Sequence, residues 1–180
     1  GASNHCHHCV QPSTQLKRCG ACKGPMYCSR ACQKAAWKGH KAECQSVQAV
    51  APHTPPSALT LTAAVLRSKG GAASPAVASL AGSIDDLDAT VKEELAGIVV
   101  LLKRYLPEDE LPAPRDAIDL LAKLRCNTFS IVDDELQAIG AGVYPKLSML
   151  NHSCAPNCCA SFRGSTLHVT AVSTIAAGTE

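Results

Sequence analysis

The strongest periodic pattern of the chain lies in its middle third. From Asp85 to Pro107, apolar side chains recur at steps of three and four residues. These side chains are Leu87, Val91, Leu95, Ile98, Val99, Leu102, Tyr105 and Leu106. This spacing places one apolar stripe along a helix, and proline is unfavourable inside a helix. The pattern therefore predicts a helix that begins near Asp85 and stops before Pro107.

Weaker helical signals flank this stretch. The apolar segment 58–67 predicts a short helix, and another is expected from Pro114 to Leu124. The prolines of 51–57 indicate an extended linker. The Gly/Ala/Ser-rich segment 68–83 is typical of a loop or an insertion with little reason to pack.

Beyond Cys126 the pattern changes to strands and turns. Glycines at 140 and 142 and a proline at 145 indicate turns, and apolar residues alternate after the Arg163-Gly164-Ser165 turn. We therefore expect a mixed α+β chain, with a helical middle region at 45–125 and a β-rich end at 126–180.

Composition narrows the class of protein. Hydrophobic residues make up 46% of the chain, but only six residues are Phe, Trp or Tyr, so aliphatic side chains must build the core. No apolar run approaches the roughly 20 residues that a membrane span needs, and the first residues do not resemble a secretion signal. We expect a soluble intracellular chain, cytoplasmic and/or nuclear.

Cysteine spacing carries the most specific chemistry of the sequence. Seven of the eleven cysteines fall in residues 1–44, and a histidine completes four pairs with short spacing. The pairs are Cys6 with Cys9, Cys19 with Cys22, Cys28 with Cys32, and His40 with Cys44. An odd number of thiols with one well-placed histidine fits tetrahedral zinc better than disulfides.

Each pair supplies half of a tetrahedron, so the four pairs predict two structural zinc ions with no open position for water. Ser29 is a candidate cap for a helix that would carry Cys32, His40 and Cys44. The spacing alone does not say whether the pairs are used in sequence or interleaved. One of His5, His7 and His8 could replace a ligand, although a flexible exposed histidine is the simpler interpretation.

Charge is distributed unevenly along the chain. Residues 1–44 carry seven Lys or Arg against Glu43 alone, which leaves 10 basic and 14 acidic residues in the remainder. Seven thiolates and two zinc ions would reduce the basic excess of the first region to about +3. The basic residues lack interleaved aromatic side chains, so this pattern argues against nucleic-acid binding.

The string RCGACKGPMYCSRACQKAAWKGHKAEC at 18–44 closely resembles the MYND zinc finger. This resemblance implies a cross-braced finger over residues 4–44. Cys6, Cys9, Cys28 and Cys32 would hold one zinc ion, and Cys19, Cys22, His40 and Cys44 would hold the other. Tyr27 and Trp37 match aromatic positions of that family, where packing around the metals is the simpler interpretation.

Three later motifs resemble successive landmarks of the SET domain in SET-MYND protein-lysine methyltransferases. They are CNTFSI at 126–131, GAGVYP at 140–145 and NHSCAPNC at 151–158. Taken alone, an Asn-His-Ser turn is more often plain loop chemistry. The resemblance implies that Asn151, His152 and Asn127 contact S-adenosylmethionine, that Phe129 walls the lysine channel, and that Cys154 joins a third zinc site. It makes 126–180 a partial, β-rich SET domain.

In that family a glycine-rich strand precedes the finger, and a strand with the catalytic tyrosine follows the region at 176–180. We therefore expect the chain to be a fragment that is inactive alone, so no catalytic residue is assigned. Its full-length protein would be an S-adenosylmethionine-dependent protein-lysine methyltransferase. Expected partners are histone or other protein substrates, and proline-containing peptides at the finger. The alternative is a non-catalytic MYND interaction protein with a degenerate SET region.

Overall fold

The computed structural model describes residues 4–178, so Thr179 and Glu180 of the predicted β-rich end lie outside the described residues. Its α-helices are α1 (Arg30–Ala49), α2 (Ser57–Leu66), α3 (Pro75–Ala78), α4 (Ala89–Tyr105) and α5 (Pro114–Asn127). Short 3-10 helices are η1 (Gly71–Ala73), η2 (Ile84–Asp86) and η3 (Glu108–Glu110). The strands are β1 (Lys17–Arg18), β2 (Met26–Tyr27), β3 (Thr128–Val132), β4 (Ala138–Val143), β5 (Cys158–Arg163) and β6 (Thr166–Ala171).

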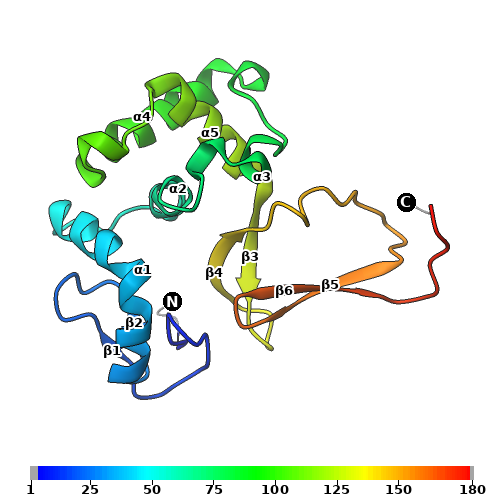
Figure 1. Ribbon diagram of the computed structural model, residues 1–180, viewed down its shortest axis with the longest axis horizontal. Coiled ribbons are helices and arrows are strands. Elements are labelled where there is room, and N and C mark those ends of the chain that lie inside the picture. The colour runs from blue at the N-terminus through cyan, green and yellow to red at the C-terminus, as the bar shows by residue number, and fades with distance from the viewer. Residues whose placement is uncertain (1–3, 179–180) are drawn as a thin grey trace.

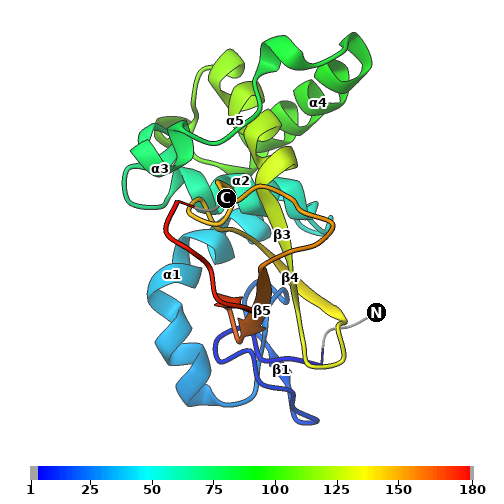
Figure 2. The ribbon, with the colours of Figure 1, turned by 90° about the vertical axis from the view of Figure 1, so that its right-hand side faces the viewer.

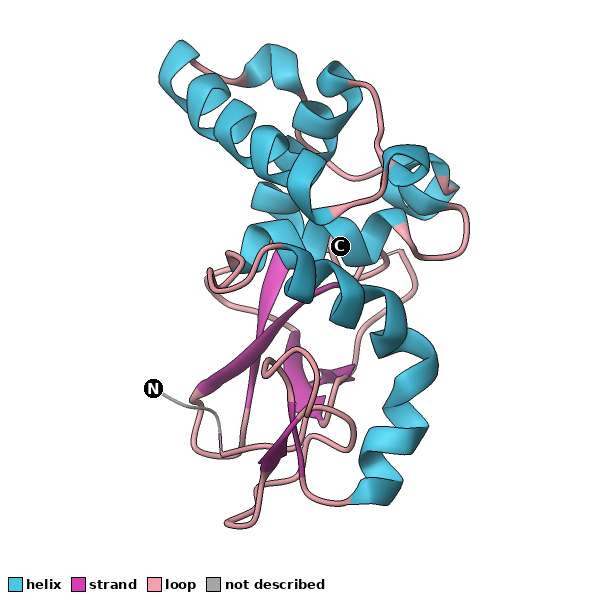
Figure 3. Ribbon diagram, turned by 90° about the vertical axis from the view of Figure 1, so that its left-hand side faces the viewer, coloured by secondary structure: helices cyan, strands magenta, loops and turns pink. Residues whose placement is uncertain are grey.

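The strands form separate antiparallel pairs within residues 4–178: β1 with β2, β3 with β4, and β5 with β6. Helices α2 to α5 gather at one end of the molecule, and the strand pairs lie at the other (Figures 1 and 2). Helix α1 runs along the side of the molecule from the finger toward the helical end (Figure 3). One helix is therefore shared by the cysteine-rich start and the helical region.

The main hydrophobic core lies among α2, α4 and α5. Its buried residues are Leu59, Ala63, Leu95, Val99, Leu102, Tyr105, Leu106, Ala117, Leu121 and Ala122. The stripe that recurs from Leu95 to Leu106 supplies half of this set, because steps of three and four residues keep side chains on one helix face. Val47 and Val50, at the end of α1, pack against the same core. This contact joins the finger to the helical region.

The predicted helices at 58–67 and from Pro114 are confirmed as α2 and α5, and α5 extends to Asn127. The longest predicted helix begins later than expected. Helix α4 starts at Ala89, because the Asp88 side chain accepts a hydrogen bond from the backbone N–H of Val91 and so caps the helix there. A separate 3-10 turn occupies Ile84–Asp86.

The expectation that 68–83 has little reason to pack is wrong. This segment contains η1 and α3, and Val77 and Leu80 are buried in a second core with Val65, Leu120 and Leu124. Two apolar side chains in a Gly/Ala/Ser-rich stretch give no periodic signal. Their burial becomes visible only when α2 and α5 are placed beside them.

An aromatic contact connects the two hairpins of the β-rich end. Tyr144 lies edge-on between Phe129 of β3 and Phe162 of β5, with ring centroids 5.9 and 5.8 Å away. The Tyr144 hydroxyl donates to the Ser165 carbonyl at 2.7 Å. A Cβ on Gly142 would stand 2.9 Å from the Tyr144 ring, so the glycine in this motif makes room for the tyrosine.

Candidate metal centre

The first two cysteine pairs sit in two turns of the same design. The Val10 N–H donates to the Cys6 carbonyl at 2.9 Å, and the Lys23 N–H donates to the Cys19 carbonyl at 3.0 Å. In each turn the residue after the second cysteine has a positive φ, 59° at Val10 and 58° at Lys23. A β-branched residue rarely adopts this conformation. The repeated strain indicates that ligand geometry fixes these turns.

The other two pairs are presented by β2 and α1. Cys28 follows β2, and Cys32 lies in the first turn of α1, where Ser29 caps the helix by accepting from the Cys32 N–H at 3.1 Å. The predicted Ser29 cap is thus confirmed. His40 and Cys44 stand four residues apart on α1, and both are buried. Residues four apart on a helix share a face, so both side chains reach one point.

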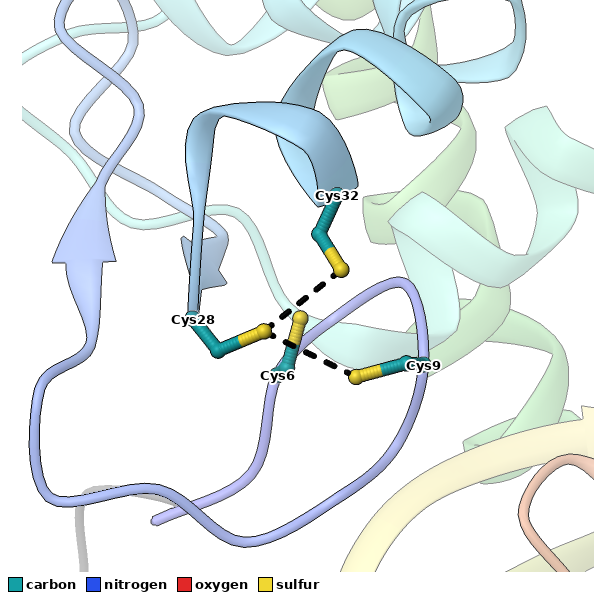
Figure 4. A group of neighbouring side chains, drawn as sticks. All are labelled: Cys6, Cys9, Cys28 and Cys32. Atoms are coloured by element: carbon teal, nitrogen blue, oxygen red, sulfur yellow. Dashed lines mark hydrogen bonds between the residues drawn. The ribbon is translucent and has the colours of Figure 1, made fainter.

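The first ligand cluster consists of Cys6, Cys9, Cys28 and Cys32, whose sulfur atoms lie within 4.8 Å of one another. The Sγ atom of Cys28 is 3.8 Å from that of Cys9 and 3.5 Å from that of Cys32 (Figure 4). Cys6 and Cys9 come from the N-terminal turn, Cys28 from the connection before α1 and Cys32 from the first turn of α1, and all four thiols point toward one centre (Figure 4).

The second cluster consists of Cys19, Cys22, His40 and Cys44, again with ligand atoms within 4.8 Å. The Sγ atoms of Cys19 and Cys44 are 3.9 Å apart, and Cys22 Sγ is 3.5 Å from His40 Nε2. The Nδ1 atom of His40 lies on the other side of the ring, 2.7 Å from the Glu43 carboxylate.

These distances fit zinc and exclude disulfides. With Zn–S bonds of about 2.3 Å, the edges of a tetrahedron are about 3.8 Å long, whereas a disulfide needs about 2.05 Å. All the cysteines of the described chain are free. Pairs one and three form the first site, and pairs two and four form the second. The structure therefore decides the question that spacing left open, in favour of the interleaved arrangement.

The environment of the first cluster divides its thiols by acidity. Burial raises the pKa of Cys6, but backbone hydrogen bonds from Cys9, Cys28 and His8 outweigh it and lower this pKa to about 6. The pKa of Cys28 rises to about 12, first because its thiol bonds to Cys32 and then to Cys6. Backbone donors thus favour a thiolate at Cys6, whereas the Cys28 thiol keeps its proton to a higher pH.

The second cluster behaves in the same way. Burial raises the pKa of Cys19, yet hydrogen bonds from the Cys22 backbone and His40 lower it to about 6. Burial and the thiols of Cys22 and Cys19 raise the pKa of Cys44 to about 12. A dication removes the repulsion among thiolates, so binding of zinc releases the remaining protons.

The ligands themselves form the centre of the finger. Its buried residues are Cys6, Cys19, Cys44 and Tyr27, with His40 only 3% exposed. So small a core cannot hold about 40 residues, and the metal must supply most of the folding free energy. Tyr27 packs around the ligands as expected. Trp37 is 43% exposed, and its ring lies edge-on to His40, with 6.0 Å between the ring centroids.

The residues expected at S-adenosylmethionine and at the lysine channel occupy three different elements. Asn127 ends α5 and is buried, and its amide donates to the carbonyls of Ala81 and Lys123, both at 2.7 Å. Phe129 lies in β3, while Asn151 and His152 are exposed in the connection between β4 and β5. Asn127 thus also fastens α5 to the segment before η2, a structural role that sequence reasoning did not assign. The cofactor contacts of Asn127, Asn151 and His152 stay predictions, and so does the place of Phe129 in the lysine channel.

Cys154 is exposed, and its sulfur lies 3.5 Å from His152 Nε2. Within residues 4–178, groups of at least three metal-binding side chains occur only at the two clusters of the finger. The third zinc site expected from Cys154 therefore stays a prediction. Sequence reasoning also missed the contact between Glu43 and His40, although their spacing on a predicted helix could have indicated it.

The turns, the shared helix and the interleaved ligands define a cross-braced module that binds two structural zinc ions. Residues 6–44 match the model of the MYND finger family. The chain is 36% identical to the human histone-lysine N-methyltransferase SMYD3 over 186 residues, which covers 97% of this chain and 44% of that protein. It is 32% identical to the N-lysine methyltransferase SMYD2-B of Xenopus laevis and to the rat SMYD2, with 98% of this chain and 43% of each relative covered.

The chain therefore contains a MYND finger and is similar, along nearly its whole length, to part of each of these lysine methyltransferases. It spans less than half of the length of these curated relatives. Among residues 4–178, none of the helices is both long and apolar enough to cross a membrane.

Proposed function

We propose that the full-length natural protein is an S-adenosylmethionine-dependent protein-lysine methyltransferase, in which this chain supplies the MYND finger and part of the SET domain. The similarity along 97% of the chain to proteins named as lysine methyltransferases carries this proposal. Histone or other protein lysines would be its substrates, and the cytoplasm and/or nucleus its location.

In this proposal Asn151 and His152 hold S-adenosylmethionine. When bound, the cofactor supplies the methyl group, and the chain has to orient it toward the lysine nitrogen. The exposed polar side chains of this connection are accessible to a ligand. Asn127 would face the cofactor through its remaining carbonyl oxygen, since its amide is bonded to backbone. Phe129, held edge-on by Tyr144, would form an apolar wall for an uncharged lysine side chain.

The test is methyl transfer by the full-length protein, combined with calorimetry of S-adenosylmethionine. We expect His152→Ala and Asn151→Ala to weaken cofactor binding at least tenfold. The control His53→Ala removes an exposed histidine from the linker and should change little. Tight cofactor binding that survives both substitutions would contradict the site. Absence of turnover by a well-folded full-length protein would favour the non-catalytic alternative.

A specific groove supports a second role, the binding of proline-containing peptides by the finger. A cavity of about 600 Å³ lies between the Cys19–Cys22 turn and the linker, and its lining includes Arg18, Pro25, Pro52 and Pro55. Three prolines of the chain are thus among the lining residues, and this lining supports the proposal that proline rings can be accommodated here.

Titration with a proline-rich peptide, followed by NMR, tests this role. Shifts should concentrate at residues 17–25 and 51–56, and a control peptide with alanine in place of proline should leave them unchanged. Equal shifts with both peptides, or shifts confined to the hairpins of the β-rich end, would contradict it.

A further inference from the structure

Glu43 has an unusual position for the only acidic residue of the finger. Helix α1 presents Arg30, Lys34, Lys38 and Lys41 to solvent. Glu43 instead lies three residues from His40, and its Oε2 atom is 2.7 Å from His40 Nδ1. The His40 side chain is only 2% exposed. The carboxylate is therefore directed at a metal ligand and not at the nearby lysines.

The geometry of the ring assigns the proton. His40 Nε2 faces the thiol cluster, 3.5 Å from Cys22 Sγ. A nitrogen that binds a metal must be free of its proton, so the neutral ring carries its hydrogen on Nδ1, where it donates to Glu43. The carboxylate thus holds the ring in the one tautomer and orientation in which Nε2 can bind zinc.

We propose that Glu43 is the positioning residue of the second zinc ion. The interaction differs from an exposed pair on a helix, which contributes only a few tenths of a kcal/mol to stability. Here the Glu43 carboxylate accepts from the Nδ1–H of a buried ligand, so loss of the carboxylate should appear mainly in the affinity for the metal. Outer partners of this kind typically change metal affinity by about 10–100-fold.

The first zinc site provides an internal reference, because its ligands are four thiols and no histidine. The sulfur of Cys6 accepts hydrogen bonds from backbone N–H groups, and the Cys28 thiol interacts with the thiols of Cys32 and Cys6. Loss of Glu43 should therefore weaken zinc binding at the second site and leave zinc binding at the first site unchanged.

Helix α1 continues from this contact to the helical region. Three residues beyond Glu43, the Ser46 hydroxyl accepts from Arg67 of the helical region at 2.9 Å. Glu43 and Thr60 line both cavities between the finger and the helical region, of about 600 and 630 Å³. Glu43 thus lies where the second zinc site meets the rest of the fold.

The experiment compares Glu43→Ala and Glu43→Gln with the control Gln45→Ala, an exposed position on the same helix. Alanine favours helix more than glutamate does, so weaker helix formation would not explain a loss of metal. The 180-residue chain is loaded with two zinc ions, and their release is titrated with a chromophoric chelator.

We expect Glu43→Ala to lower the zinc affinity of one site by about 10–100-fold. The affinity of the other site should stay within about twofold of its value in the unmodified protein. The zinc affinity of Glu43→Gln should lie between those of the unmodified protein and Glu43→Ala, because the amide oxygen still accepts from Nδ1–H but carries no charge. Cobalt substitution identifies the weakened site, since a site of four thiolates absorbs differently from a site of three thiolates and one imidazole. In the zinc form, ¹⁵N spectra should show the Nδ1–H tautomer of His40 in the unmodified protein and a ring of less restricted geometry in Glu43→Ala.

Three outcomes would overturn the proposal. They are unchanged affinity for both ions in Glu43→Ala, equal weakening of both ions, or the same loss in Gln45→Ala. Equal weakening would make Glu43 a general stabiliser of α1, with no particular relation to His40.

Discussion

Removal of one ligand from each zinc site should affect the helical region differently. Cys28 lies before α1, in a turn that is far along the chain from the helical core. His40 lies in the middle of α1, and the last turns of that helix pack against the core through Val47 and Val50. We expect Cys28→Ala to disorder the first cluster only, and His40→Ala to loosen α1 and, through it, the helical region.

The structure sets the size of the difference. Full burial of a valine side chain stabilises by about 1.5–3 kcal/mol. Val47 and Val50 are only partly buried, so together they contribute about 2 kcal/mol. The hydrogen bond from Arg67 to Ser46 adds about 1 kcal/mol. His40→Ala should thus lower the free energy of opening of α4 and α5 by about 2–4 kcal/mol, and Cys28→Ala by less than about 1 kcal/mol.

Hydrogen exchange read by mass spectrometry measures this opening for each helix. Native mass spectrometry confirms in parallel that each variant has lost one zinc ion. The reasoning would be refuted if both variants lowered protection of α4 equally, or if His40→Ala left it unchanged. Either result would mean that α1 does not transmit the state of the second site to the core.

Three further predictions concern the helical region. Arg67→Met removes the hydrogen bond to Ser46 and the ion pair with Glu110 (2.6 Å). Urea unfolding should show a loss of about 1–3 kcal/mol, because solvent screens the ion pair at Glu110, whose side chain is about one-third exposed. Leu102→Ala, at a fully buried position, should cost about 3–5 kcal/mol, whereas Val100→Ala, at a position 60% exposed, should cost less than about 1 kcal/mol. The Tyr105 hydroxyl is buried without a partner, so Tyr105→Phe should leave stability at pH 7.5 unchanged or higher. Burial raises the pKa of Tyr105 to about 12, so the stability that depends on its neutral hydroxyl is fully present below pH 10 and is lost as the pH rises toward 12. Thermal unfolding at alkaline pH should therefore show less destabilisation in Tyr105→Phe than in the unmodified protein.

Local rules were sufficient for the helices with a clear stripe and for the ligands. The steps of Leu95, Val99, Leu102 and Leu106 predict a buried helix face, and α4 provides it. The start of α4 was misplaced because Asp85 and Asp88 are both plausible caps, and only the structure shows which aspartate accepts a helical N–H. Phe129 could be proposed for a lysine channel, and Asn151 and His152 for a cofactor site, only by resemblance, since their segments are short and far apart in the sequence.

The sequence by itself determined that each cysteine pair is a chelating unit, because two ligands three or four residues apart can meet one ion within a single turn. The tertiary structure alone decided which pairs share an ion, that Val77 and Leu80 belong to a core, and that Glu43 faces His40. The physical reason is distance along the chain. Chelation within a turn depends on neighbouring dihedral angles, whereas the joining of Cys9 to Cys28, or of α3 to α5, depends on how distant segments fold against one another.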